Sequence, residues 1–127
     1  MDSVLRQRRA GFTLIEIMIV VAIIGLLVTL ALPSFMKSRK QAQGRRIVND
    51  AKQMDGAVDQ WAFELNKKDG DAIDTVAAST YLKPASWDAG DAVGNAWVIG
   101  NVGTNQIRIS SLTKSSLANV GVDWGVY

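Results

Sequence analysis

A single glutamate, Glu16, lies inside a run of apolar residues that holds no other ionisable side chain. The run extends from Phe12 to Leu32 and reads FTLIEIMIVVAIIGLLVTLAL. A carboxylate in a lipid-facing helix costs about 2 to 4 kcal/mol, so such a residue normally meets a partner or serves a function. The run contains no Lys, Arg or His, and the sequence therefore predicts no partner for Glu16 within its own helix.

The missing cation could be an amino group freed by cleavage of the chain just before Phe12. The bond to be cut joins Gly11 to Phe12, at the end of a short leader that carries three arginines and one aspartate. The new amine on a neighbouring copy would then compensate the Glu16 carboxylate. This pattern predicts processing followed by assembly of copies.

Catalytic residues are missing from the sequence. It has no His and no Cys, so the usual general base, the thiol nucleophile and the common zinc ligands are absent. The glycines at 90, 94, 100 and 103 are not followed by the Gly-Lys-Ser/Thr of a phosphate-binding loop. We therefore expect a protein that is not an enzyme and needs no cofactor.

The apolar run must form the element that positions Glu16. As a helix, its 21 residues span roughly 30 Å, enough to cross a bilayer. An ordinary secretory signal has a shorter apolar core, followed by a cleavage site of small residues. Residues 29–33, at the end of this run, match such a site poorly. That reading and a plain single-pass anchor with an incidental Glu remain as alternatives.

The basic leader ending in Gly11, followed by Phe-Thr-Leu-Ile-Glu and an apolar helix, resembles the class III signal of type IV pilins and type II secretion pseudopilins. The resemblance implies a membrane peptidase that cuts after Gly11 and N-methylates Phe12. It also implies that Glu16 pairs with the amine of an adjacent subunit. Pro33 falls where many members carry a helix-loosening proline, and its missing N–H predicts bending or melting near residues 29–33.

We expect an α+β fold with a long N-terminal helix and a small antiparallel sheet packed on it. The predicted segments are the leader (1–11), the membrane or filament-core helix (12–33), an amphipathic continuation (34–66), and a loop and sheet head (67–127). The continuation has apolar residues at spacings of three and four along one face, which are Val48, Ala51, Met54, Val58, Trp61, Ala62 and Leu65.

The head sequence predicts one short helix and a hairpin. Asp74 is placed to cap a helix from Thr75 to Leu82, before a proline. Alternating runs at 95–99 and 106–110 predict two strands, joined through 100–105. Because two strands alone are marginal, we expect a third near 120–126.

Charge is distributed unevenly along the chain. Residues 47–127 hold 6 basic and 10 acidic side chains, so the head is acidic and we expect no nucleic-acid partner. A basic cluster follows the apolar run, formed by Lys37, Arg39, Lys40, Arg45 and Arg46. It could meet lipid head groups, meet acidic surfaces of neighbouring subunits, or simply form a solvated helix face.

The stretch 91–97 resembles in part a signature of major pseudopilin heads, Asp-Pro-Trp-Gly-Asn-Pro-Tyr. Asp91, Gly94 and Asn95 match, Trp97 replaces the Tyr, and the prolines and central Trp are missing. The match favours a pseudopilin over a surface pilin.

The same resemblance suggests that a structural calcium ion could bind in the head loops. Asp88, Asp91 and Asp123 are suitable ligands by type, although their spacing is not that of an EF-hand. Solvated loop aspartates are the favoured reading, so we predict no metal site.

The sequence therefore predicts a structural subunit of a type IV pilus-like or type II secretion pseudopilus filament. Its expected partners are copies of itself, related pilins, a prepilin peptidase, an inner-membrane assembly platform and membrane lipid. The precursor would cross the bacterial inner membrane once, with its head outside, before joining a periplasmic pseudopilus or a cell-surface pilus. The alternative is an uncleaved single-pass protein whose head binds a partner.

Overall fold

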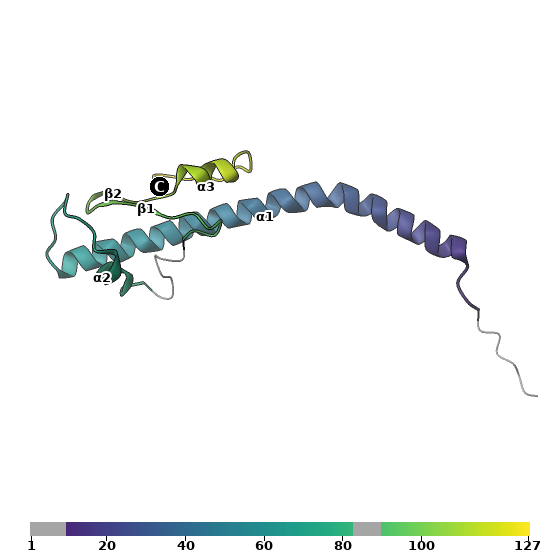
Figure 1. Cartoon of the computed structure of the whole chain (residues 1–127), viewed down its shortest axis with the longest axis horizontal. Coiled ribbons are helices and arrows are strands. Elements are labelled where there is room, and N and C mark those ends of the chain that lie inside the picture. The colour runs from purple at the N-terminus through teal and green to yellow at the C-terminus, as the bar shows by residue number, and fades with distance from the viewer. Residues whose placement is uncertain (1–9, 83–89) are drawn as a thin grey trace, which may run out of the picture. The chain divides into compact units, whose positions relative to one another are not determined.

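The computed structural model describes residues 10–82 and 90–127 (Figure 1). It divides into two compact units, Met1–Met36 and Lys37–Tyr127, which we describe separately. The expected α+β class is confirmed: a long helix, α1, runs from Leu14 to Glu64, and a small antiparallel sheet follows in the second unit.

Helix α1 is continuous over 51 residues and contains Pro33. Of the predicted bending or melting near residues 29–33, melting is wrong, since all of these residues are helical, while bending stays a prediction. Pro33 has no N–H to give to the Thr29 carbonyl. The Thr29 hydroxyl itself donates to the Leu26 carbonyl oxygen, 2.7 Å away.

The C-terminal end of α1 is a Schellman motif closed by an asparagine. Asn66 adopts a positive φ of 56°. Its N–H donates to the Phe63 carbonyl (3.3 Å), and the Lys67 N–H donates to the Ala62 carbonyl (2.8 Å). These two bonds satisfy carbonyls that the last turn would leave without partners. The helix ends at Glu64, in agreement with the predicted end near Asn66.

The predicted apolar face of the amphipathic half is largely confirmed. Its buried members are Ala51, Met54, Val58, Trp61 and Ala62. Leu65 was expected there but is 55% exposed, because it lies beyond the last turn. Ile47 and Ala57 complete the buried face. The core joins this face to Ala78 and to residues nearer the C-terminus, which are Val102, Ile107, Ile109, Leu117 and Val120.

Helix α2 spans Thr75–Ser79 and is capped as predicted. The Asp74 carboxylate accepts from the N–H groups of Val76 and Ala77, each at 3.1 Å. The helix is shorter than expected, since residues 80–82 continue in tighter turns. The proline expected to stop it lies outside the described residues.

The hairpin is confirmed but its connection is shorter than predicted. Strand β1 (Val98–Asn101) pairs antiparallel with β2 (Thr104–Arg108), so only residues 102–103 separate the strands. Gly103 has a φ of +81°, and a Cβ on Gly100 would lie 2.2 Å from the Asn105 carbonyl oxygen. These two glycines permit the tight turn and the close strand approach.

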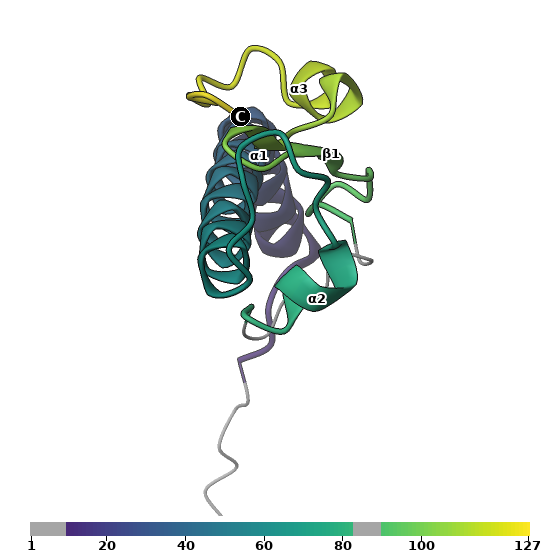
Figure 2. The ribbon, with the colours of Figure 1, turned by 90° about the vertical axis from the view of Figure 1, so that its left-hand side faces the viewer.

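The predicted third strand is wrong. Helix α3 (Ser111–Ser116), which the sequence analysis missed, follows β2 directly, with the Ser110 side chain as its N-cap. Residues 117–127 contain no strand. Asn119, Gly121 and Gly125 all have positive φ there, which interrupts an extended backbone. In place of a third strand, the chain forms α3 and an irregular C-terminal segment (Figure 2). Leu117, directly after α3, and Val120, in the C-terminal segment, belong to the core.

Candidate functional site

The expected processing site lies in an open, irregular segment. Ala10–Thr13 belong to neither helix nor strand, and α1 begins at Leu14. Phe12 is 86% exposed, and no atom of residues 10–82 or 90–127 lies within 4 Å of the position a Cβ would take on Gly11. The Gly11–Phe12 bond thus lies outside the helix, and no described residue covers it. The leader residues 1–9 lie outside the described residues.

Glu16 has a hydrogen-bond partner within its own helix, contrary to the sequence analysis. The Thr13 N–H donates to Glu16 Oε2 (2.9 Å), and the Glu16 N–H donates to Thr13 Oγ1 (3.3 Å). This reciprocal pair is a capping box, and the carboxylate also complements the positive end of the helix dipole. The Thr-x-x-Glu spacing before an apolar run was the signal that could have revealed it. The bond supplies no cation, so the charge itself is not neutralised.

The side chains in the apolar half of α1 are exposed. The helix is long and apolar enough to cross a membrane, with a mean hydropathy of 2.8 over its most apolar stretch, none of which is buried. An apolar hollow of about 370 Å³ is lined by Phe12, Glu16, Ile17, Ile19 and Val20. Phe12, just before the helix, and Glu16, in its first turn, therefore border the same hollow. Pro33 lies about 26 Å further along the helix, and the structure does not bring it to Glu16.

The partial pseudopilin signature forms a tight turn in the head. The Asp91 carboxylate accepts from the N–H groups of Val93 (2.9 Å) and Asn95 (3.0 Å). The hydroxyl of Thr113, on α3, donates to the other Asp91 oxygen and accepts from the Asn95 side-chain amide at 2.9 Å. Asp91 and Thr113 are both buried. Asp91 and Asn95, which match the signature, thus connect the loop before β1 to helix α3 through hydrogen bonds.

The two described aspartates considered for calcium, Asp91 and Asp123, both accept hydrogen bonds from the chain. Both Asp91 carboxylate oxygens already accept hydrogen bonds from the chain. Asp123 is exposed and accepts from the Gly125 N–H, and Asp88 lies outside the described residues. Within residues 10–82 and 90–127, no group of three or more acidic side chains is arranged to hold a metal ion.

A second polar cluster, which sequence reasoning missed, joins α1 to the hairpin and the C-terminal residue. The Gln106 amide donates to Asp59 (2.7 Å) and Asp55 (3.3 Å), and the Tyr127 hydroxyl donates to Asp55 (3.4 Å). Burial, followed by the nearby Asp59 charge, raises the pKa of Asp55. Burial and the Asp55 charge likewise raise the pKa of Tyr127. The i, i+4 spacing of the two aspartates places them on one face of α1.

The basic cluster that follows the apolar run is exposed to solvent. Arg46 lies 3.7 Å from Asp50 in an i, i+4 ion pair with a largely exposed arginine. Such surface pairs contribute little to stability. Arg45 makes no ion pair with any residue that the structure describes, and it lines a cavity discussed below.

Comparisons with known proteins identify the segment around Glu16. The family described as "Prokaryotic N-terminal methylation motif" matches residues 6–32. The type II secretion system core protein G of Klebsiella pneumoniae is 38% identical over 61 residues, which cover 48% of this chain and 44% of that protein. The chain thus spans less than half the length of this relative.

Two fimbrial proteins are also similar. The type IV major fimbrial protein FimA of Dichelobacter nodosus is 37% identical over 65 residues, covering 51% of this chain and 41% of the relative. The fimbrial protein EcpC of Eikenella corrodens is 31% identical over 115 residues, covering 90% of this chain and 69% of the relative. No solved structure matches the chain significantly.

The fold and the N-terminal site define a class of protein: a long apolar helix with a methylation-type N-terminus, followed by a small α+β head. The likeness to EcpC extends over most of both chains and includes the head. The chain belongs to the type IV pilin and type II secretion pseudopilin family.

Proposed function

We propose that this chain is the structural subunit of a type IV pilus-like or type II secretion pseudopilus filament. The observation that carries the proposal is the exposed apolar half of α1. Its first turn contains one carboxylate, that of Glu16, and the Gly11–Phe12 bond lies in the non-helical segment just before it. A helix that exposes nearly all of its apolar side chains requires lipid or other helices around it. The role is structural rather than catalytic.

The precursor would cross the inner membrane once, with the head outside the cytoplasm. A prepilin peptidase would cut between Gly11 and Phe12 and methylate the new amine. An assembly platform in the inner membrane would then move the subunit into the filament. There, the apolar residues 12–33 would pack against copies of the same helix and of related pilins.

Glu16 would select the register between neighbouring helices. The capping bond from Thr13 satisfies one carboxylate oxygen but leaves the negative charge. The Phe12 amine of an adjacent subunit would supply the opposite charge. A neighbour that slipped along the axis would leave both charges unpaired in an apolar core, which is strongly unfavourable.

Intact mass and N-terminal peptide mass spectrometry test the processing step. The protein is taken from membranes of its native host, or from a host that expresses a prepilin peptidase together with a control substrate. We expect a chain that begins at N-methylated Phe12. A chain still beginning at Met1, while the control is cleaved, would contradict the proposal and favour an uncleaved anchored protein whose head binds a partner.

Two variants of Glu16 separate charge compensation from helix capping. Glu16→Gln keeps an oxygen that can accept from the Thr13 N–H but removes the charge, whereas Glu16→Ala removes both. We expect both variants to insert and to be cleaved, and both to yield few filaments. Normal assembly of Glu16→Gln alone would assign the residue to capping, and normal assembly of both would remove it from the assembly mechanism.

A further inference from the structure

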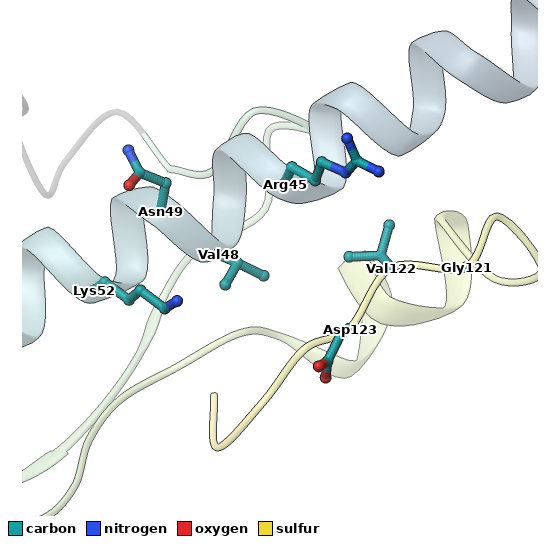
Figure 3. A pocket seen from close by; sticks show the side chains of 7 residues that line it. All are labelled: Arg45, Val48, Asn49, Lys52, Gly121, Val122 and Asp123. Carbon is teal, nitrogen blue, oxygen red and sulfur yellow. The ribbon is translucent and has the colours of Figure 1, made fainter.

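A cavity of about 360 Å³ lies between α1 and the C-terminal segment of the head. Its walls are residues Arg45, Val48, Asn49 and Lys52 of α1 on one side and Gly121, Val122 and Asp123 on the other. Figure 3 shows the Val48 and Lys52 side chains facing Val122 and Asp123. We call this cavity the basic groove, since two of its four helix residues are cations.

The cations of the basic groove have no acidic partner in the described part of their own chain. Neither Arg45 nor Lys52 forms an ion pair with residues 10–82 or 90–127. The one carboxylate at the rim, Asp123, already accepts from the Gly125 N–H. The groove also has an apolar floor, where Val122 packs against Gly44. Its chemistry fits a carboxylate carried on a partly apolar surface.

The charges along α1 supply a ligand of that kind. Residues 37–52 hold six basic side chains and one acidic side chain, whereas residues 53–66 hold three acidic side chains and no basic one. We call residues 53–66 the acidic segment; its members with charge are Asp55, Asp59 and Glu64. Asp59 and Glu64 are exposed. Asp55 and Asp59 accept from Gln106 and Tyr127, which are neutral, and neither carboxylate forms an ion pair with residues 10–82 or 90–127.

From this complementarity, we propose that the basic groove binds the acidic segment of α1 from a second copy of the chain. Lys52 and Asp59 are seven residues apart, and Arg45 and Asp55 are ten apart. At 1.5 Å per residue these separations are about 10.5 and 15 Å, so a single displacement of about 13 Å between parallel copies would bring both pairs to within about 2 Å of the same level along the axis. Copies without displacement would place like charges side by side, which is unfavourable.

This contact is heterologous, because it joins two different surfaces of the same chain. Each copy has one groove and one acidic segment, so the contact repeats without closing. It would thus set axial register in the head, in addition to the register set by Glu16 in the apolar half. The inference rests on the proposed filament function.

A charge swap tests the pairing in the full-length chain. We expect Lys52→Glu or Asp59→Lys alone to lower the filament yield about tenfold, and the double variant to recover most of it, since like charges facing each other at an interface oppose association. Arg108→Glu, a reversal of an exposed charge on β2, serves as the control and should leave the yield unchanged. Processing at Gly11–Phe12 is measured in every variant.

The outcomes distinguish this inference from the proposed function. If the unaltered chain forms filaments and the double variant assembles no better than either single variant, the groove contact is wrong while the filament function stands. If Lys52→Glu assembles normally but loses binding to vesicles containing anionic lipid, the groove faces a membrane surface and the inference is overturned. If the unaltered chain forms no filament, the proposed function itself fails.

Cross-linking measures the displacement directly, because the native chain has no cysteine. Asn49→Cys and Gly56→Cys introduce thiols seven residues apart at exposed positions next to the proposed contact. Filaments that mix the two variants should form disulfide-linked dimers, while filaments of either variant alone should form few. Efficient dimers from one variant alone would indicate copies without displacement and would contradict the inference.

Discussion

The two halves of helix α1 share one backbone conformation and differ in what surrounds them. Side chains from residue 14 to 36 are exposed throughout, whereas the second half buries Ile47, Ala51, Val58 and Trp61 in the head core. The core of the described residues includes none from the first half. The comparison shows that one helix supplies core residues in its second half and leaves its apolar side chains exposed in its first half.

The largest expected effect on head stability comes from truncating a buried side chain in the second half of α1, compared with an exposed one in the first half. Trp61→Ala should lower the free energy of unfolding of the head by about 3 to 5 kcal/mol, because it removes a large side chain that is 2% exposed. Ile24→Ala, a truncation in the apolar half, should leave head stability unchanged, since Ile24 is 55% exposed. Urea unfolding of the full chain in detergent micelles, followed by fluorescence of the remaining tryptophans, measures both. Equal losses would contradict the division between the halves.

Two glycines on the second half of α1 give a matched pair. A Cβ on Gly44 would lie 2.4 Å from a Val122 methyl, whereas a Cβ on Gly56 would meet no described residue within 4 Å. Gly44→Ala should therefore destabilise the head by about 1 to 3 kcal/mol and displace the C-terminal segment. Gly56→Ala should stabilise it by about 0.5 to 1 kcal/mol through helix propensity.

Unfolding midpoints and hydrogen exchange of residues 118–127 check this pair. Faster exchange of the C-terminal segment is expected in Gly44→Ala only. The same response in both variants would show that helix propensity, rather than the contact with Val122, decides the outcome.

A smaller loss in the free energy of unfolding is expected when the hydrogen bonds that join the Asp91 turn to α3 are removed. Thr113→Val keeps the shape of a fully buried side chain but removes the hydroxyl that joins Asp91 to Asn95. Leaving these groups without a partner should cost about 1 to 2 kcal/mol. Thr113→Ser, which retains the hydroxyl, is the control for urea unfolding. A Ser variant that is less stable than the Val variant would show that packing outweighs the hydrogen bonds.

The smallest expected effect concerns the pH dependence of head stability. Because the pKa of Asp55 in the folded head is raised above 3.8, folding favours its protonated form, and this contribution is present at pH below 3.8. It is lost as the pH rises through the raised value. Asp55→Asn should therefore flatten this fall and stabilise the head at neutral pH, by about 0.5 kcal/mol at most, since solvent screens a partly exposed carboxylate.

Unfolding of the full chain from pH 3 to 7 measures the effect. Asp123→Asn removes a carboxylate from the exposed C-terminal segment and serves as the control. An identical pH profile for Asp55→Asn and the unaltered chain would show that burial of Asp55 and its proximity to Asp59 have no net influence on stability.

The amino-acid sequence determined the apolar half of α1, its length, its single charge and the methylation motif that contains it. These features follow from local pattern: an uninterrupted apolar run needs no tertiary contact to be recognised, and Gly11, Phe12 and Glu16 occur within six residues. The Asp74 cap and the Asn66 helix end were likewise predicted from local chemistry. The buried face of α1 followed from its 3.6-residue period, except where Leu65 passes beyond the last turn.

Only the tertiary structure decided the end of the head and the polar contacts within it. Residues 120–126 had the apolar content of a strand, but three positive-φ residues between 119 and 125 prevent pairing, and α3 occupies the chain after β2. The contacts of Thr113 with Asp91 and of Gln106 with Asp59 join residues 22 and 47 positions apart. The basic groove is of the same kind, because its walls come from residues about 70 positions apart, and only packing of the C-terminal segment on α1 creates it.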